Sequence, residues 1–518
     1  MVEKIYGHLL GKECREEKQR LLLSFLAVFS IGLFAHGMQF LSLSPSHDYL
    51  FSFFESEGEY VNALELGRYL QPVFRAVTGT AAAIPWSIGL LSLTFLSLAV
   101  YGTARMFEIH SKGWILLLAG LMTANITVTA TAGTYMTYLG PFSLALTLAV
   151  YAALCWKRFT KTGKAGFLLA GSLLIFLSAG LYQAYLFVAV TWILLDSILS
   201  LLQDKKAKKV MLHGLWAVGM ILLGAALYFL LLIPAEKLTG VGLKQGDYNS
   251  VTNAFRGVSS IIHGFLQCYV QFARSFTVAY ASVFSKYLIL AVHGILVLAA
   301  AVCGVRFLIK HRLGIWEGIL LAVLLLLLPA AALGIVILNG EMHDLMKYAL
   351  CGVYLLPMLL ADPGKNIQGA KGAALLAAAM MTILIFGNIQ TANLLYTEKQ
   401  LEFDGTVSIM TNVLSDIEDM EGYEPGITEV CFVGYPQEVM VRLPYKDRVS
   451  QIIGCGEDSP ITHPTKYGYF FRNILQRDVN VRMEELYPDC LPLPQYPQQG
   501  SVCWWEGRIV VNFLDFRN

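Results

Sequence analysis

A histidine and an aspartate, His47 and Asp48, stand side by side shortly after the apolar run 21–43. A carboxylate can take a proton from a hydroxyl group, and ionisable residues beside an apolar segment often mark functional sites. Asp48 is therefore our candidate general base, and His47 is a candidate substrate-binding residue. A structural interpretation has equal weight, because an Asp ahead of "YLFSFF" could instead cap the first turn of a helix.

Two arginines follow, Arg68 and Arg75, within "LGRYLQPVFRAVTG" (66–79). Guanidinium groups make charge-assisted hydrogen bonds to phosphate. If a helix opens at Pro72, its free N–H groups and its dipole would favour an anion at the same place. Tyr69 and its apolar neighbours suit a helix that lies in the membrane plane. The stretch predicts a phosphate site at headgroup depth, with Arg68, Tyr69 and Arg75 as substrate-binding residues.

Three further polar residues lie at the ends of apolar segments. Gln183 is in "LYQAY" (181–185), where tyrosines are typical of a membrane interface but a glutamine is harder to explain. His343 and Lys347 are four residues apart in "GEMHDLMKYAL" (340–350), so they share one face of a helix. Lys347 could bind a lipid phosphate or only extend to water, and binding is slightly favoured. We count all three as candidate substrate-binding residues.

No cofactor is predicted from the motifs. The nine cysteines form no CxxC pair, which argues against zinc. Glu55 and Glu57 leave a divalent metal such as Mg²⁺ or Mn²⁺ as an alternative. The segment "GHLLGK" (7–12) lacks the spacing and the Ser/Thr of a phosphate loop, and HExxH and GxSxG do not occur. We therefore do not expect an ATP-driven pump.

Long uncharged segments must position these residues. Only 14% of the residues are charged, against about 25% in soluble domains, and 56% are hydrophobic. The uncharged segments are each near the roughly 20 residues that cross a bilayer. We predict an α-helical polytopic membrane protein, and the net charge of +1 gives no reason to expect nucleic acid as a partner. The expected spans, about eleven, are 21–43, 85–107, 114–132, 135–155, 166–182, 184–202, 210–234, 286–307, 315–338, 344–361 and 372–396. The semi-polar segment 256–284 is predicted to be an interfacial or cavity-lining helix instead.

The loops between these spans differ in charge. Nearly all loop lysines fall on one side, which the positive-inside rule makes cytoplasmic. We therefore expect residues 1–20 in the cytoplasm, residues 21–396 as the transmembrane domain, and an outer loop at 44–84. The first apolar run is too long for a cleavable signal and is predicted to remain as a span. An odd number of spans places residues 397–518 outside the cell.

The last part of the chain has a different composition. From residue 397 charge returns, and prolines become frequent. "EVCFVGY" (429–435) predicts a short buried strand, and "SVCWWEGRIVVNFLDF" (501–516) predicts a hairpin that turns near Glu506-Gly507. Residues 404–420 have the apolar spacing of an amphipathic helix. We expect a small extracytoplasmic α/β domain at 397–518.

The order of these motifs resembles a known family. A first span, "HD", "GRYLQPVFR", "YQAY", "GNIQTANLLYTEKQLEFD" and an outer "EVCFVGYP" follow one another along most of the chain. This pattern is similar to the bacterial type-II O-antigen glucosyltransferases. These are polytopic membrane enzymes of GT-C architecture that use a polyprenyl-phosphate sugar outside the membrane.

The resemblance implies roles for several residues. Asp48 matches the acidic residue of the first outer loop, which acts as base or orients the acceptor in such enzymes. Arg68 matches the Gly-Arg-aromatic motif. His47 stands where a second acid is expected, and Lys347 stands where the family often has an arginine. The implied reaction moves a hexose, with glucose suggested, from polyprenyl phosphate to a cell-envelope glycan or lipid-linked acceptor, while Arg68 and Arg75 bind the donor phosphate.

Two other classes compete with an enzyme. The first is a flippase or other transporter of lipid-linked sugars, although internal repeats typical of transporters do not occur in the sequence. The second is a non-catalytic envelope assembly protein. Sugar transfer that is lost in Asp48→Asn and Arg68→Ala would separate an enzyme from both, and translocation without transfer would indicate the flippase.

The two roles of Asp48 predict different outcomes for Asp48→Asn. Asn caps a helix about as well as Asp, but it cannot take a proton from a hydroxyl. If Asp48 is the base, the variant folds and no longer transfers labelled sugar from polyprenyl phosphate in vitro. Normal sugar transfer by a folded Asp48→Asn protein would show that Asp48 is not the general base, and the helix-cap interpretation would remain.

Overall fold

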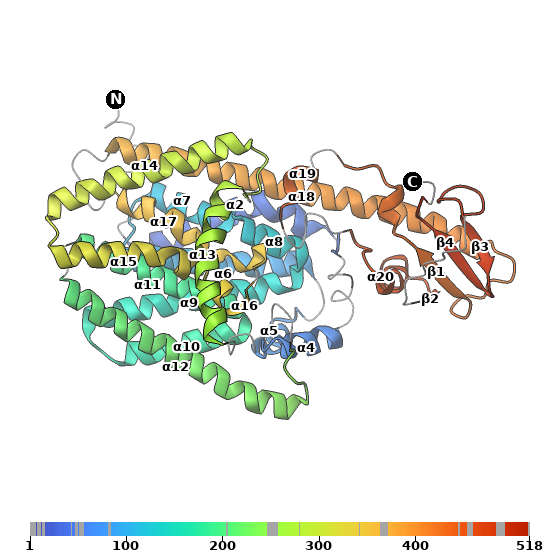
Figure 1. The fold of residues 1–518 in the computed structure, drawn as a ribbon, viewed down its shortest axis with the longest axis horizontal. Coiled ribbons are helices and arrows are strands. Elements are labelled where there is room, and N and C mark those ends of the chain that lie inside the picture. The colour runs from blue at the N-terminus through green and yellow to red at the C-terminus, as the bar shows by residue number, and fades with distance from the viewer. Residues whose placement is uncertain are drawn as a thin grey trace.

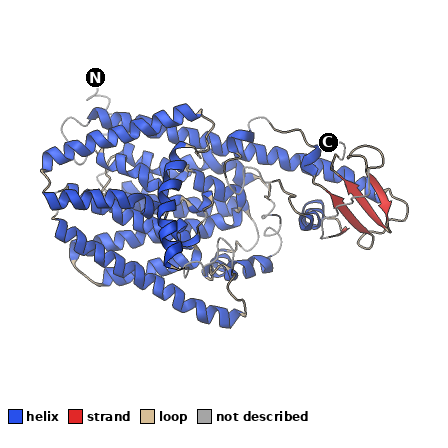
Figure 2. Cartoon of the chain, in the orientation of Figure 1, coloured by secondary structure: helices blue, strands red, loops and turns tan. Residues whose placement is uncertain are grey.

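The computed structural model describes residues 7, 12, 16–42, 44–46, 50, 56–80, 84–203, 206–245, 257–278, 280–340, 342–362, 371–443, 446–452, 459–482 and 493–515. These residues form a bundle of apolar helices with a small sheet at one end (Figure 1). Among the described residues, strands occur only in this terminal part (Figure 2). The largest buried cluster of apolar side chains lies inside the bundle, and a second one lies under the sheet.

Within these residues nine helical segments are long and apolar enough to cross a membrane. Two shorter apolar helical segments join them, α10 (Gly166–Leu181) and η4 with α17 (Tyr348–Leu360). Each of the predicted spans overlaps one of these segments, and the chain is a polytopic helical membrane protein. The nine are α2 (Glu17–Leu41), α6 (Pro85–Met106), α7 with α8 (Lys112–Thr134), α9 (Met136–Thr162), η1 with α11 (Gln183–Leu202), α12 (Ala207–Thr239), α14 (Lys286–His311), α15 (Ile315–Ala332) and α18 (Lys371–Glu418).

The predicted span 114–132 is interrupted in the structure. Helix α7 (Lys112–Thr123) ends before Asn125, and α8 (Ile126–Thr134) begins after it. The Asn125 side chain accepts a hydrogen bond from Val128 N and donates to the Leu121 and Met122 carbonyls. One side chain thus supplies partners on both sides of the break, as the interior of a membrane protein requires.

Short helices complete the bundle. Helix α16 (Gly334–Asn339) follows α15, and the 3-10 turn η3 (Asp344–Met346) precedes η4 (Tyr348–Leu350). Helices α4 (Ser56–Glu65) and α5 (Leu70–Thr78) lie at the end of the bundle that is nearer the sheet (Figure 1). Helix α13 (Val258–Thr277) runs across the other helices in the same view, and its Ser275 and Phe276 line a cavity, as predicted for the segment 256–284.

The C-terminal sheet has four strands in the order β2-β1-β4-β3. They are β1 (Glu429–Val433), β2 (Asn480–Val481), β3 (Val502–Trp505) and β4 (Arg508–Asn512). Strand β1 pairs in parallel with β2 and β4, while β3 and β4 form an antiparallel hairpin. Glu506 and Gly507 have φ of 48° and 79°, as a two-residue hairpin turn needs. The predicted strand at 429–435 and the hairpin at 501–516 are both confirmed.

Helix α18 joins the bundle to the sheet without a break (Figure 1). It passes residue 397, where the sequence predicts a domain boundary, and it includes most of the helix predicted at 404–420. Its Met410, Val413 and Ile417 belong to the apolar cluster under the sheet. Leu50, from the segment after the first span, is in the same cluster. The two parts of the chain therefore share helix α18, and Leu50 of the first part belongs to the core of the second.

Close packing of α12 on α10 gives a test of this arrangement. A Cβ at Gly224 would lie 2.6–2.7 Å from Ile175 and from the Ser172 carbonyl, whereas a Cβ at Gly219 meets nothing within 4 Å. We expect Gly224→Ala to lower the free energy of unfolding by about 1–3 kcal/mol, because the helices must move apart. Gly219→Ala should be neutral or stabilise by up to about 1 kcal/mol through helix propensity. Thermal unfolding of the purified protein measures both, and equal melting temperatures would contradict the packing.

Candidate functional site

Arg68 lies in a tight turn between α4 and α5. The turn is closed by hydrogen bonds from Gly67 N to Leu64 O at 2.9 Å and from Arg68 N to Ala63 O at 2.8 Å. Gly67 has a φ of 69°, a left-handed conformation that residues with a Cβ adopt at a cost. The glycine of the Gly-Arg-aromatic sequence therefore has a local role, since it reverses the chain so that Arg68 points into the protein.

The Arg68 guanidinium is buried among aromatic rings. Arg68 is 8% exposed, and its Cζ lies 5.0 Å from the ring centre of Tyr182 and 5.7 Å from that of Phe142. Among the described residues, its Nε has no hydrogen-bond partner and no carboxylate forms an ion pair with the guanidinium. Cation–π contacts offset part of the cost of burying a guanidinium, but a buried cation still favours a nearby anion.

Side chains from the bundle hold the turn in place. Gln183 Nε2 donates to Leu66 O at 2.7 Å and to the Tyr228 hydroxyl at 2.9 Å. The Tyr228 hydroxyl in turn donates to Gly67 O at 3.0 Å. Gln183, a predicted substrate-binding residue, thus bonds the backbone that precedes Arg68. Tyr228, which no sequence motif selects, completes this support from α12.

The residues after Arg68 extend the same contacts. Tyr69 stacks on Tyr228, with ring centres 5.7 Å apart, and its buried hydroxyl has no hydrogen-bond partner among the described residues. Burial, together with the nearby Tyr228, raises the pKa of Tyr69 well above its usual range, so its hydroxyl stays neutral. Gln71 Nε2 donates to Leu181 O at 2.7 Å. Arg75, one turn later on α5, is also buried.

His47 and Asp48 lie outside the described residues, but their neighbours are placed. Ser46 Oγ donates to Thr134 O at 2.7 Å, at the end of α8. Asn473, in the C-terminal domain, donates to Leu50 O at 3.2 Å. Thr134 is close in sequence to Phe142 on α9, the ring under Arg68. On one side of Asp48, Ser46 is thus bonded to the end of α8, and on the other side Leu50 is bonded to the C-terminal domain.

The other predicted cation has a different environment. Lys347 Nζ lies 2.7 Å from Asp344 Oδ1, and both side chains are largely buried. They line a cavity of about 80 Å³ together with Asn125 and Asn388. His343 precedes Asp344, and its carbonyl accepts from Met346 N at 3.0 Å.

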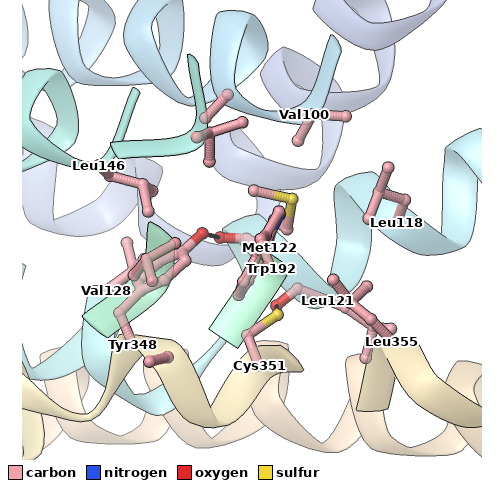
Figure 3. Packing of buried hydrophobic residues seen from close by; sticks show 14 of the residues in the cluster. Val100, Leu118, Leu121, Met122, Val128, Leu146, Trp192, Tyr348, Cys351 and Leu355 are labelled. Carbon is pink, nitrogen blue, oxygen red and sulfur yellow. Dashed lines mark hydrogen bonds between the residues drawn. The ribbon is translucent and has the colours of Figure 1, made fainter. Parts of the chain in front are cut away.

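A row of aromatic rings connects the Arg68 turn with the Asp344–Lys347 pair. The rings of Tyr182 and Tyr185 are 4.9 Å apart, and those of Tyr185 and Tyr348 are 5.5 Å apart. Figure 3 shows Tyr348 and Cys351 directed at the α7 backbone, where they donate to the Met122 and Leu121 carbonyls. The structure therefore brings Arg68, Tyr69 and Gln183 into one network, with Arg75 adjacent on α5. His343 and Lys347 lie at the other end of this row of rings.

Metal ligation has no support in the part of the chain that the structure describes. No group of three or more His, Cys, Asp or Glu side chains lies there with metal-binding geometry. Glu55, one of the two acids considered for a metal, lies outside the described residues, and Glu57 is placed only as part of α4. The six described cysteines are all free thiols.

The chain matches a known protein family. The model of the family described as Glucosyl transferase GtrII matches residues 37–361, which is more than half of the chain. The matched region includes Arg68, Gln183, Tyr228 and Lys347. No curated protein matches the chain.

The support of the Arg68 turn can be tested without an activity assay. Tyr228→Phe removes the donor to Gly67 O and the acceptor for Gln183, so it should destabilise the turn by about 1–3 kcal/mol. Hydrogen–deuterium exchange of peptides that cover residues 63–69 should become faster. Tyr287→Phe, at a tyrosine of α14 that is 84% exposed, is the control and should leave exchange unchanged. Unchanged exchange at residues 63–69 in Tyr228→Phe would show that the turn does not depend on these bonds.

Proposed function

Because this chain belongs to the glucosyl transferase GtrII family, we propose that it moves glucose from a polyprenyl phosphate to a cell-envelope glycan or lipid-linked acceptor. The chain is a multi-pass membrane glycosyltransferase. The carrier, the acceptor and the outer face of the membrane as the place of reaction are part of the proposal. The excess of lysine in the loops opposite α4 and α5 supports this orientation.

The observation that carries the proposal is the Arg68 guanidinium. It is buried, it rests on two aromatic rings, and the described residues offer it no carboxylate. A guanidinium has a planar fork of N–H groups, which can bond two phosphate oxygens at once. A phosphate monoester or diester would supply the negative charge that the site lacks.

The proposed reaction is a direct displacement at the sugar. Asp48 takes the proton of an acceptor hydroxyl, whose oxygen forms a bond to the anomeric carbon. The bond from that carbon to the phosphate oxygen breaks at the same time, and polyprenyl phosphate leaves with the electron pair. Arg68 and Arg75 stabilise the charge that develops on the leaving phosphate, a role that often lowers a barrier by several kcal/mol. His47 and Tyr69 are proposed to orient the sugar.

Lys347 and His343 are proposed to act on the same substrate from a greater distance. The Asp344 carboxylate already neutralises Lys347, at 2.7 Å. Lys347 therefore needs a rearrangement before it could bind an anion, whereas Arg68 needs none. Gln183 is proposed to position Arg68 through the backbone of the turn.

One observation favours the second candidate, a flippase of lipid-linked sugars. Transporters often use interrupted helices around a polar site in the membrane. The break at Asn125 faces the Asp344–Lys347 pair across the small cavity, and α17, at ten residues, covers about 15 Å, or half of a bilayer core. A reconstituted protein that moves the lipid across the bilayer without sugar transfer would establish this candidate.

Arg68 gives the direct test of the glycosyltransferase proposal. Arg68→Ala should lower kcat/KM for the polyprenyl-phosphate donor by about 10²–10³, as for other groups that stabilise developing charge. Arg68→Lys should recover only part of this loss, because an ammonium keeps the charge but not the planar fork. The assay measures transfer of labelled glucose from polyprenyl phosphate by the purified protein in lipid.

The matched control is Arg158→Ala, at an exposed arginine near the opposite end of α9. It should leave the donor kinetics unchanged. Donor kinetics in Arg68→Ala that equal those of the unaltered protein would remove Arg68 from the phosphate site. Loss of activity with loss of the folded protein, seen in thermal unfolding, would be assigned to stability, and Arg68→Lys then decides the question.

A further inference from the structure

A second polar cavity lies where α18 enters the C-terminal domain. Its volume is about 380 Å³, within the range of ligand sites, and it is several times larger than the one beside Lys347. Its polar walls are Glu402 on α18 and Gln437, Arg442, Lys446 and Ser450 of the domain. We propose that this cavity binds the saccharide of the acceptor, an inference that rests on the proposed function.

Buried acceptor atoms near this junction lack donors. Gln437 Oε1, in the cavity wall, has no hydrogen-bond partner among the described residues. Glu398 Oε2 also has none, and Glu398 is only 6% exposed. Glu398 is one turn before Glu402 and on the same face of α18. Buried acceptors of this kind are costly unless a partner arrives, and sugar hydroxyls are donors.

The charges in the wall are arranged for a neutral, hydroxyl-rich ligand. Lys446 Nζ lies 3.1 Å from Glu402 Oε1, and Arg442 pairs with Asp447. These pairs balance the charge at the site, so it lacks the unpaired cation that distinguishes Arg68. A carboxylate held by a lysine keeps lone pairs free to accept from hydroxyl groups. The cavity therefore suits a saccharide better than a second phosphate.

The rim of the cavity is apolar. Met440, Val441 and Leu443 are part of the lining, and Val441 is 89% exposed. Glu402 is only a few residues beyond the end of the span predicted at 372–396. An exposed apolar rim at this level can contact lipid while the polar wall binds a sugar. The same saccharide could belong to a lipid-linked glycan or to a free glycan.

The cavity shares its helix with the anchors of the Asp48 segment. Ser42 donates a hydrogen bond to Gln400, two residues from Glu402. On the far side of Asp48, Leu50 packs with Met410 in the core of the domain. The residues that flank the predicted base thus contact α18 on both sides of Glu402. The cavity and the residues that flank the proposed base are therefore associated with the same stretch of α18.

Photocrosslinking in cells that make the protein naturally tests the site. A p-benzoylphenylalanine replaces Val441 at the rim, and, as the matched control, it replaces Ile427, which is 69% exposed and not in the lining. We expect a saccharide adduct at position 441 and none at 427, identified by mass spectrometry. Glu402→Gln should reduce the adduct about tenfold or more, as loss of a charge-assisted bond does. Glu418→Gln, elsewhere on α18, should not reduce it.

Each result decides the proposal. No saccharide adduct at 441, equal adducts at 441 and 427, or an adduct unaffected by Glu402→Gln would overturn it. Lipid on the captured saccharide identifies a lipid-linked acceptor, and its absence identifies a free glycan. Crosslinking needs no turnover. An adduct without glucose transfer would therefore contradict the proposed reaction but support the saccharide site. Glucose transfer without an adduct would remove only the site.

Discussion

A backbone carbonyl inside an apolar bundle must find a donor within the chain, because lipid offers none. Three helix interruptions in the described part of the chain obey this constraint. At the break between α7 and α8, Asn125 bonds the Leu121 and Met122 carbonyls, and Tyr348 also reaches Met122. His36 contacts the Thr123 carbonyl at 3.0 Å. Gln71 donates to Leu181 O at the end of α10. Gln183 donates to Leu66 O at the end of α4.

This constraint explains how the protein holds an arginine at Arg68. The turn at Leu66–Gly67 is fixed by donors from two other helical segments, so the direction of Arg68 is decided by the bundle. The guanidinium then lies beside the rings of Tyr182 and Phe142, which stack on each other with their centres 3.6 Å apart. Burial without an acidic partner among the described residues keeps the cation available for an anionic ligand. Lys347 illustrates the opposite case, because its ammonium group already forms an ion pair with Asp344.

The sequence predicted the parts of the fold that depend on local composition. The length of the apolar segments located the helices, because a bilayer requires about 20 apolar residues to cross it. The Glu506-Gly507 turn marked the hairpin. Charge returning at residue 397 was interpreted as a boundary, but charge marks where a helix leaves lipid and does not end it, so α18 continues to Glu418. The break at Asn125 has no Gly or Pro to indicate it, and its additional donors come from distant segments.

The sequence predicted single residues of the candidate site, but not the contacts between them. Residue type selected Arg68, and the odd position of a glutamine selected Gln183. Their relation was not visible, because Tyr228 reaches Gly67 across 161 residues of sequence. A tyrosine within an apolar span gives no local sign of such a bond. The roles of His47 and Asp48 stay predictions, since these residues lie outside the described part of the chain.

The uninterrupted course of α18 makes the C-terminal domain a lever on the bundle. The part of the helix from residue 397 to Glu418 is about 33 Å long at ~1.5 Å per residue. A tilt of about 10° at the membrane would swing its far end by about 6 Å, as this rise per residue implies. A small change in the tilt of α18 within the bundle therefore moves the sheet by a larger distance. Conversely, a bulky glycan that pushes on the sheet applies a torque to the helices of the bundle.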